Sequence, residues 1–361
     1  MIVVAGGGVA GSVASCLLRL AGRPVLLLER ETGPHDKVCG EFLSHEATAV
    51  LRQTGLDPLA LGAAPIGAVR LVHGRFAAAA ALPFPAHGLS RRALDEALIG
   101  RAAGLGAEVV RGHAVRAAEG TRLLLDGGVV DASVVFLATG KHDLRGARRV
   151  PQRKPEPLVG FKTHLRLRPD ARLALRGTVE IITFRGGYAG LQLVERDRAN
   201  LCLLVRRERL AEEGGTWVAL LGALCAESEH LARRLDGAAE LFERPLTVSR
   251  VPYGFLYHPD AADPAGVFRL GDQMAVIPSF SGDGMAIAAY TAQRAVEAFL
   301  AGRGATEYHG ALRRALRPQL TRAGRLYRVG RRAPWLTVAV ARLWPGLMRR
   351  AALLTRVPTA G

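Results

Sequence analysis

The chain has 361 residues, of which 49% are apolar and 22% charged, and its formal net charge is +17. This composition predicts an ordered protein with a large core and excludes a disordered or low-complexity chain. Its four cysteines, Cys16, Cys39, Cys202 and Cys225, form no Cys-x-x-Cys pair, which argues against a metal cluster or a disulfide framework. We therefore expect a cytoplasmic protein. No run of 18 uncharged apolar residues occurs, so we expect no membrane span.

The positive charge is concentrated at the end of the chain. Residues 302–361 contain 13 arginines and one acid, Glu307, so +12 of the net charge lies there. Only four lysines occur in the whole chain, so an arginine-rich genome is an alternative source of this excess. No recognition motif for nucleic acid accompanies the charge, and we expect no nucleic-acid partner.

The first thirty residues have the pattern of a dinucleotide-binding unit. A short apolar strand at residues 2–5 leads into the Gly-x-Gly-x-x-Gly turn of Gly6, Gly8 and Gly11 and a helix-length apolar run. The glycines permit a tight turn, close approach of a pyrophosphate and close helix packing, and Val9 and Ala10 of this turn are expected to contact the cofactor. The helix expected from Gly11 to about Ala21 would point its free amides at the phosphates. A second apolar strand ends at Glu29, where a carboxylate would bind a ribose hydroxyl, with Arg30 beside it.

A resemblance to a known family begins at the loop behind this unit. Lys37-Val-Cys39-Gly40-Glu41 resembles the loop of the geranylgeranyl reductase-like flavoproteins. It is similar, more loosely, to that of flavin-dependent group A monooxygenases and halogenases of the same fold. The resemblance covers about residues 1–300. It implies that the dinucleotide is FAD and that Cys39 and Gly40 lie near its isoalloxazine ring. A small buried side chain is the alternative interpretation of Cys39.

The same resemblance implies further FAD contacts along the chain. Arg91, directly after the helix-capping Ser90, would face the FAD phosphates or ribose, although it could equally be a solvated arginine at a helix start. Val115 would touch the adenine through its backbone. The turn Thr139-Gly140 replaces the Asp-Gly of group A monooxygenases, which leaves the usual pyridine-nucleotide contact open.

A second glycine-rich element near residue 270 repeats the pattern of the N-terminus. An apolar strand ends in Gly271-Asp272, and Gly282, Gly284 and Met285 then begin a long helix. In the family that this chain resembles, this element completes the FAD site. The carboxylate of Asp272 would bind ribitol or ribose hydroxyls, and the glycine turn would present backbone amides to the pyrophosphate and the flavin ring.

We therefore predict an α/β fold, in which a Rossmann-type, glutathione reductase-like FAD-binding domain is interleaved with a mainly antiparallel substrate domain and followed by a helical C-terminal tail. The strands expected between residues 159 and 205 alternate as in a sheet with one covered face, and residues 210–235 are expected to be helical. A proline-rich crossing at residues 151–157 is the expected boundary. The expected FAD-binding segments are 1–68, 89–154 and 259–301, the substrate segments 69–88 and 155–258, and the basic helical region 302–361.

The implied function is FAD-dependent oxidation or reduction of an apolar small molecule, a biosynthetic intermediate. A monooxygenase using reduced flavin and O2 is favoured, with NAD(P)H as a transient electron donor. A reductase of carbon–carbon double bonds is the alternative, although residues 188–195 lack the Trp, Pro and Lys of the geranylgeranyl reductases. A tryptophan-type halogenase is disfavoured because the Trp-x-Trp-x-Ile-Pro signature is absent, and a non-catalytic flavin-binding protein is a further alternative. The candidate catalytic groups are Cys39, His164, Tyr188 and Tyr253, with no metal.

The C-terminal region suggests a partner. Its arginines accompany an apolar stripe that includes Trp335, Leu343, Trp344 and Leu347. Such a surface would attract a membrane or an acidic carrier protein, and the substrate would then be a lipid or a carrier-bound molecule. In the alternative interpretation, the stripe packs on the body of the protein and the substrate is free. The sequence does not indicate an oligomeric state.

Overall fold

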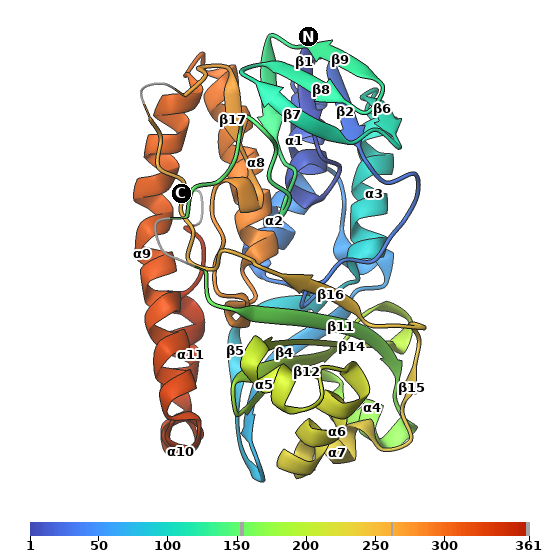
Figure 1. Cartoon of the computed structure of the whole chain (residues 1–361), viewed down its shortest axis with the longest axis vertical. Helices are drawn as coiled ribbons and strands as arrows, with labels where there is room; N and C mark the ends of the chain where they lie inside the picture. The colour runs from blue at the N-terminus through green and yellow to red at the C-terminus, as the bar shows by residue number, and fades with distance from the viewer. Residues whose placement is uncertain (152–154, 261–262, 359–361) are drawn as a thin grey trace.

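The computed structural model describes residues 1–151, 155–260 and 263–358. Residues 152–154, inside the predicted boundary, lie outside these ranges. Two β-sheets lie one above the other along the long axis, and a column of helices runs beside both (Figure 1). No helix of the described residues is long and apolar enough to span a membrane.

The upper sheet is the nucleotide-binding sheet that the N-terminal pattern predicts. Its five strands are all parallel and are, in sheet order, β17 (Val267–Arg269), β10 (Val134–Leu137), β1 (Ile2–Ala5), β2 (Val25–Glu29) and β6 (Glu108–Arg111). Every residue of β1 and β2 is buried. This explains their continuous apolar sequence, since a parallel sheet is covered on both faces.

Alternate residues of this sheet face two different cores. Ile2, Val4, Leu27 and Phe136 pack in one core with α1 (Val9–Leu20), α3 (Arg91–Gly104) and α8 (Gly284–Leu300). The intervening residues, among them Val3 and Val135, pack against a three-stranded meander. The meander comprises β7 (Val115–Glu119), β8 (Arg122–Leu125) and β9 (Gly128–Asp131), the last two forming a hairpin around Asp126.

The lower sheet has nine strands drawn from three parts of the chain. They are β15 (Ala239–Glu240), β11 (Leu158–Arg166), β14 (Ala199–Arg206), β13 (Gly187–Leu193), β12 (Gly177–Phe184), β4 (Ala64–His73), β5 (Phe76–Gly88) and β3 (Phe42–Leu43), with β16 (Leu246–Ser249) paired to β11. Among the described strands of this sheet, only β4 and β12 pair in parallel. The interleaved α/β fold with a mainly antiparallel second sheet is confirmed, although the early hairpin begins at Ala64 and not at residue 69.

Both faces of this sheet are covered, whereas the sequence suggested one covered face. Phe161, Leu191 and Leu201 belong to the core that includes Trp217 and Leu220 of α6. The opposite face, which carries Lys162 and Asn200, is buried against the loop between β2 and β3. The helix expected at residues 210–235 is divided into α5 (Arg207–Glu212), α6 (Trp217–Glu227) and α7 (Glu229–Leu235), because Gly214 and Gly215 adopt positive φ and Ser228 begins a new helix with its side chain as the cap.

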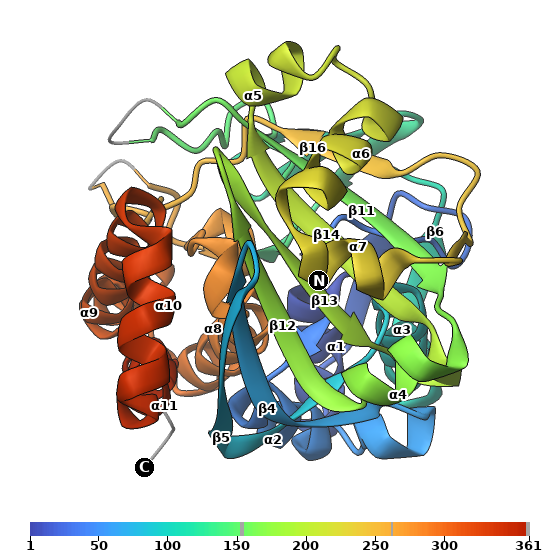
Figure 2. The ribbon, with the colours of Figure 1, turned by 90° about the horizontal axis from the view of Figure 1, so that it is seen from below.

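The remaining helices cover the sides of the two sheets. They are α2 (His45–Gln53), α4 (Pro169–Leu175), α9 (Ala305–Arg332), α10 (Pro334–Leu343) and α11 (Pro345–Leu354), with short turns at η1 (Pro58–Leu61), η2 (Glu195–Asp197), η3 (Gly271–Gln273) and η4 (Ser279–Ser281). Pro334 and Pro345 each begin a helix, a position at which proline loses no intrahelical hydrogen bond. Seen from below, α9, α10 and α11 lie together on one side of the molecule, next to β4 and β5 (Figure 2).

Helix α9 connects both layers. Near its start, the hydroxyl of Tyr308 donates to the carbonyl of Arg269 in β17 at 2.9 Å, and Nε2 of His309 accepts the amide of Arg269 at 3.0 Å. Burial, with the nearby Arg269, lowers the pKa of His309 to about 3, so the ring stays neutral and can accept. At its other end, Arg331 forms an ion pair with Glu156 at 2.6 Å, just before β11.

A buried carboxylate provides a test of how the lower sheet is held together. The side chain of Glu180 in β12 is fully buried; it pairs with Arg70 of β4, and with His230 and Arg234 of α7 at 2.8 Å each. Burial opposes its ionisation, but His230 and Arg234 outweigh burial and lower its pKa to about 2. Its contribution to stability is therefore fully present above the ordinary pKa of 4.5 and is lost as pH falls through about 2.

We expect Glu180→Gln to lower the free energy of unfolding at pH 7 by about 3–5 kcal/mol, because it leaves two arginines without a buried counter-charge. Urea unfolding measures this. The matched control is Glu229→Gln, whose side chain is 65% exposed and pairs with Arg233 one helical turn away; that change should cost less than about 0.5 kcal/mol. Equal effects of the two variants would contradict this assignment.

Candidate flavin and substrate site

A cavity of about 800 Å³ lies between the carboxyl ends of β1, β2 and β10 and the lower sheet. This volume lies within the range of about 300–1,000 Å³ usual for ligand sites. All of the predicted cofactor-binding residues except Gly11 line it, namely Gly6, Gly8, Val9, Ala10, Glu29, Arg30, Cys39, Gly40, Arg91, Val115, Thr139, Gly140, Gly271, Asp272, Gly282, Gly284 and Met285. Segments from both ends of the FAD-binding pattern therefore meet at one site.

Each glycine of the N-terminal turn is required for a different structural reason. Gly6 has a φ of +112°, and a Cβ there would lie 2.5 Å from the carbonyl oxygen of Ala138. A Cβ on Gly11 would lie 1.9 Å from the carbonyl oxygen of Gly6, so Gly11 allows the helix to approach the turn. Gly7, which the sequence pattern did not select, donates its amide to Oε2 of Glu29 at 2.6 Å. This contact holds the Glu29 carboxylate at the edge of the cavity, where a ribose hydroxyl could reach it.

Two cationic side chains lie in front of Gly8. A Cβ at this position would lie 3.3 Å from Nη2 of Arg91 and 3.7 Å from Nζ of Lys37. Both cations pair with Asp95, Lys37 at 2.8 Å and Arg91 at 2.7 Å. Burial opposes the ionisation of Asp95, but Arg91 and Lys37 outweigh it and lower its pKa. Arg91 is thus a largely buried, paired residue and not a solvated helix-start arginine.

Two helix N-termini face the cavity. Helix α1 begins after Gly8 and α8 after Asp283, and neither has a side-chain cap. Their first residues, including Val9 and Gly284, line the cavity. Uncapped amides and the positive ends of two helix dipoles, together with Lys37 and Arg91, fit a pyrophosphate. The carboxylates of Glu29 and Asp272, which also line the cavity, can accept hydrogen bonds from sugar hydroxyls, so the residues present fit FAD.

A buried ionic cluster joins the FAD side to the lower sheet. The loop after β2 carries Glu41, which has a φ of +58° and is fully buried. Its carboxylate accepts from Nζ of Lys162 at 2.5 Å, lies 2.7 Å from Nε2 of His164, and accepts the amide of Arg91 at 2.8 Å. Nζ of Lys162 also lies 3.2 Å from Asp36. One carboxylate therefore contacts both β11 and the start of α3.

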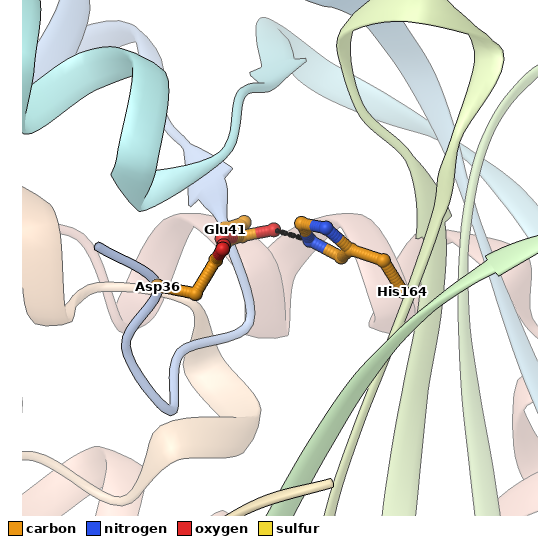
Figure 3. Close-up of side chains that lie close together, drawn as sticks. All are labelled: Asp36, Glu41 and His164. Carbon is orange, nitrogen blue, oxygen red and sulfur yellow. Dashed lines mark hydrogen bonds and ion pairs between the residues drawn. The ribbon is translucent and has the colours of Figure 1, made fainter. Parts of the chain in front are cut away.

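Asp36, Glu41 and His164 also have the spacing of a metal site, with one ligand atom from each within 4.8 Å of the others (Figure 3). The ammonium of Lys162, however, contacts both carboxylates. A cation would have to displace this ammonium. The arrangement is therefore an ion-pair cluster with its own cation already in place.

The cavity wall opposite the glycine turns is mostly apolar. Leu204 of β14, Leu246 and Val248 of β16, Val251 and Ile277 form it. The few polar groups among them include Cys39, Cys202, Tyr253 and Ser279. Burial raises the pKa of Cys202 to about 12 and raises the pKa of Tyr253 above its usual range, so the thiol and the phenol keep their protons. Both can act as hydrogen-bond donors to a ligand.

The predicted catalytic residues occupy different places. Cys39 and Tyr253 line the cavity. Tyr188 is not among the residues that line the cavity, but its hydroxyl is 2.5 Å from the hydroxyl of Ser279, which does line it, and its ring packs against Phe280 and Tyr327. His164 is fully buried in the ionic cluster, and it is not among the residues that line the cavity. Catalytic roles for all four stay predictions.

Several residues that position the site were missed by sequence reasoning. Arg149 donates to Asp143, to the carbonyl of Lys141 and to the carbonyl of Asp272, at 2.6–3.1 Å. Gln273 donates to the carbonyl of Gly140 at 2.8 Å. These bonds tie the turn after β10 to the Gly271-Asp272 element. Glu41 stood in the quoted loop motif, but its partners Lys162 and His164 are more than 120 residues away, and no local pattern connects them.

The end of the chain reaches the same site. After α11, Arg356 donates to the carbonyl of Ser281 at 2.6 Å and pairs with Asp283 at 2.9 Å. Asp283 is the N-cap residue of α8 and is fully buried. Burial raises the pKa of its carboxyl to about 7, although Arg356 opposes this. The glycine turn that begins α8 is therefore fastened by a residue from the C-terminal region.

Comparison with known proteins agrees with this geometry. Residues 1–146 match the family model described as FAD binding domain. The chain carries an FAD-binding domain. The FAD-binding domain that the sequence predicts is confirmed over these residues, and the segments Gly271–Asp272 and Gly282–Met285, outside the match, close the same cavity.

Two solved structures share the fold over most of the chain. The flavin-dependent brominase Bmp2 has a TM-score of 0.81 at 20% identity, covering 98% of this chain and 92% of the other. A flavoprotein/dehydrogenase from Cytophaga hutchinsonii has a TM-score of 0.71 at 20% identity, covering 84% of this chain and 79% of the other. At these identities the likeness concerns the fold alone.

A short stretch has a curated relative. Over 55 residues, the chain is 47% identical to menaquinone reductase from Mycobacterium tuberculosis (strain H37Rv). This match spans 15% of the chain and only 14% of that protein's length, far less than the whole of either.

The space in front of Gly8 gives a test of cofactor binding. We expect Gly8→Ala to raise the dissociation constant for FAD at least tenfold, about 1.4 kcal/mol, because the methyl group would occupy the phosphate space. The cofactor-free protein should keep its melting temperature, since the neighbours are flexible side-chain ends and the φ of Gly8 is −76°. FAD titration and thermal unfolding measure both. Gly100→Ala, on α3 with no described atom within 4 Å, is the control and should bind FAD as the wild type does. Unchanged FAD affinity in Gly8→Ala would place the phosphates elsewhere.

The Arg356–Asp283 pair predicts a pH dependence. Folding raises the pKa of Asp283, so between about pH 4 and pH 7 the folded protein binds a proton that the unfolded chain has released. The free energy of unfolding therefore falls as pH rises through this range. Arg356→Gln removes the charge that favours the carboxylate and raises this pKa further. At pH 6 the Asp283 carboxyl is mostly protonated, so the positive charge of Arg356 contributes little to stability. At pH 8 the carboxyl is ionised, so the ion pair with Arg356 contributes in full.

We therefore expect Arg356→Gln to destabilise the protein by about 1–2 kcal/mol more at pH 8 than at pH 6. Chemical unfolding at the two pH values measures this. The exposed Arg350→Gln serves as the control and should show no such difference. A pH-independent loss in Arg356→Gln would show that only its uncharged contacts, such as that to Ser281, are important.

Proposed function

We propose that this protein is an FAD-dependent monooxygenase that acts on an apolar small-molecule biosynthetic intermediate. The observation that supports this best is the continuity of the cavity. The glycine turns and cations that fit FAD occupy one side, and the apolar wall of Leu204, Leu246 and Val248 faces them. A substrate between the two would contact both the flavin and the wall.

The protein's own groups would bind, orient and exclude water. The apolar wall favours a substrate with little polar surface, and it keeps bulk water away from the reacting atoms. Tyr253 and Cys202, which keep their protons, would donate hydrogen bonds to a carbonyl or hydroxyl of that substrate. Cys39, whose Sγ accepts the amide of Glu41 at 3.4 Å, would define the edge of the ligand space next to the ionic cluster.

When bound and reduced, FAD supplies the electrons with which O2 is split, one oxygen atom entering the substrate and the other leaving as water. NAD(P)H would supply those electrons as a transient donor. The whole-chain likeness to a flavin-dependent brominase, an enzyme of the same fold, supports chemistry of this kind over electron transfer alone.

A reductase of carbon–carbon double bonds is the second candidate. It is supported by the 55-residue stretch that is 47% identical to menaquinone reductase and by the Lys37–Glu41 loop. The strand at residues 188–195, without the Trp, Pro and Lys of geranylgeranyl reductases, argues against it. In the third interpretation, a non-catalytic flavin-binding protein, no space for a substrate is needed. The extension of the cavity to the wall of β14 and β16 favours an enzyme.

Isotope incorporation distinguishes these functions. The FAD-loaded protein is reduced with NADPH and given either a long-chain alkylphenol or menaquinone, with ¹⁸O2 or without oxygen. We expect the product to gain one ¹⁸O atom and turnover to require oxygen. A product that instead gains two hydrogens under anaerobic conditions would establish the reductase. Failure to turn over either class would favour the non-catalytic interpretation.

A pair of cysteine substitutions tests where the substrate lies. Cys202→Phe places a large ring at the cavity wall and should lower kcat/KM for the accepted probe at least tenfold, about 1.4 kcal/mol, with FAD still bound. Cys225→Phe, in α6 on the other face of the lower sheet, is the matched control and should turn over as the wild type does. Cys39→Ser adds a readout for the reductase alternative, in which product stereochemistry or rate changes while FAD is retained. If Cys202→Phe turned over at the wild-type rate, the substrate would not bind against this wall.

A further inference from the structure

Helices α10 and α11 are seated on the lower sheet by only one side. Val338 and Ala341 of α10 pack with Ala78 of β5, and Leu71 of β4 and Met348 of α11 lie against this small core. Ala352 of α11 adds to the neighbouring core of Phe42 and Phe84. We refer to residues 334–354 as the basic hairpin. The inner apolar residues of the basic hairpin are therefore covered by the body of the protein. The alternative interpretation, in which the apolar stripe packs on the body, explains these inner residues but not the outer ones.

The outer side of the basic hairpin is also apolar. Trp335 and Trp344 are each 61% exposed and Leu343 is 70% exposed. The other large apolar residues that stay exposed here are Leu336, Leu347, Leu353 and Leu354. Single exposed apolar side chains are ordinary on a protein surface, but this many on two consecutive short helices form a patch that needs a partner.

The charged side chains on or next to the basic hairpin are positive. Arg332, Arg342, Arg349 and Arg350 are exposed on or next to the basic hairpin. The sequence contains no aspartate or glutamate after Glu307, so no acid on the tail neutralises them. The acid from the body that pairs nearby, Glu156, is engaged by Arg331 at 2.6 Å.

We propose that the basic hairpin docks the protein on the surface of an anionic lipid bilayer. Tryptophan favours the boundary between acyl chains and headgroups, leucine enters the acyl region, and arginine binds lipid phosphates in a bidentate manner. The two short helices would lie in the plane of the interface with the outer apolar side chains inserted. An acidic carrier protein would match the arginines but leave two exposed tryptophans and five exposed leucines to be covered by an otherwise polar partner.

The basic hairpin is connected to the cavity through Arg356. The chain leaves α11 and within two residues places Arg356 on the carbonyl of Ser281 and on Asp283. The neighbouring Gly282 and Gly284 line the cavity. A membrane bound by the basic hairpin would therefore lie close to the part of the cavity next to α8. Resting on the proposed function, this geometry selects a substrate dissolved in the bilayer, such as a polyprenyl or long-chain lipid.

Vesicle binding tests this proposal directly, without requiring activity. The FAD-loaded protein is sedimented with vesicles of phosphatidylcholine alone or with about 30% phosphatidylglycerol, as salt rises from about 50 to about 500 mM. We expect binding only to the anionic vesicles and a steep loss with salt. The protein has three tryptophans, and Trp217 is buried, so Trp335 and Trp344 supply the exposed signal. Their emission should shift to shorter wavelength and be quenched by lipids brominated on the acyl chains.

Matched variants separate the surface from its general charge. Arg349→Glu/Arg350→Glu should weaken vesicle binding roughly 30-fold or more, since each arginine near an anionic surface contributes about 1 kcal/mol. Trp335→Ser/Trp344→Ser removes the fluorescent reporter, so this variant is followed by sedimentation, and its binding to the anionic vesicles should be weaker than that of the wild type. Arg166→Glu/Arg176→Glu makes the same change of net charge at exposed positions of β11 and the end of α4, and should bind as the wild type does.

Equal binding of all charge variants, or no preference for anionic vesicles, would overturn the proposal. So would binding to an isolated acidic carrier protein with no binding to vesicles. Bound FAD and the melting temperature of each variant confirm that it is folded. Vesicle binding by a protein that shows no oxygen incorporation would uphold the docking surface while removing the proposed monooxygenase, so the two can fail separately.

Discussion

The arrangement of the site depends on one buried carboxylate. Glu41 is held with a positive φ at the end of the loop that leaves the FAD-binding domain, and it contacts Lys162 and His164 of β11 and the first amide of α3. A fully buried carboxylate is stable only with such partners, so the loop cannot move away from the sheet without leaving uncompensated charges. Cys39 and Gly40, which join the cavity wall to this cluster, are positioned by the same contact, and Asn200 of β14 reinforces it through both of their carbonyls. The position of this loop between the two sheets is therefore fixed by ion pairs and hydrogen bonds.

The two faces of the lower sheet have different roles, because successive side chains along each strand point to opposite faces. Phe161, Leu191 and Leu201 point into the core under α6, while Lys162, Gln192 and Asn200 on the other face bind the loop of the FAD domain. Further along this second face, Cys202 and Leu204 form the wall of the cavity. The same two-residue period therefore supplies both a hydrophobic core and a surface able to bind a ligand.

Sequence reasoning reached the parts of the site that local patterns encode. Gly6, Gly8, Glu29 and Asp272 were identified because each stands at the end of an apolar strand, where parallel sheets bind nucleotides. His164 and Tyr188 were predicted to be catalytic groups because they are polar residues on strands expected to form an otherwise apolar pocket. Their partners, Glu41 and Ser279, come from loops far along the chain, and alternation does not reveal such pairings. The division of residues 210–235 into three helices was missed because it depends on the backbone of Gly214 and Gly215, whose positive φ the apolar periodicity does not encode.

The order of strands in the two sheets has a consequence for how the protein is made. Strand β1 leaves the ribosome first, but its neighbour β10 follows more than 120 residues later and β17 more than 260 residues later. In the lower sheet, β4 must wait for β12 before it gains its parallel partner. Pairings of this sequence separation form slowly and leave strand edges open during synthesis. Strand edges of the nascent chain thus stay open to aggregation until β17 has emerged and completed the upper sheet.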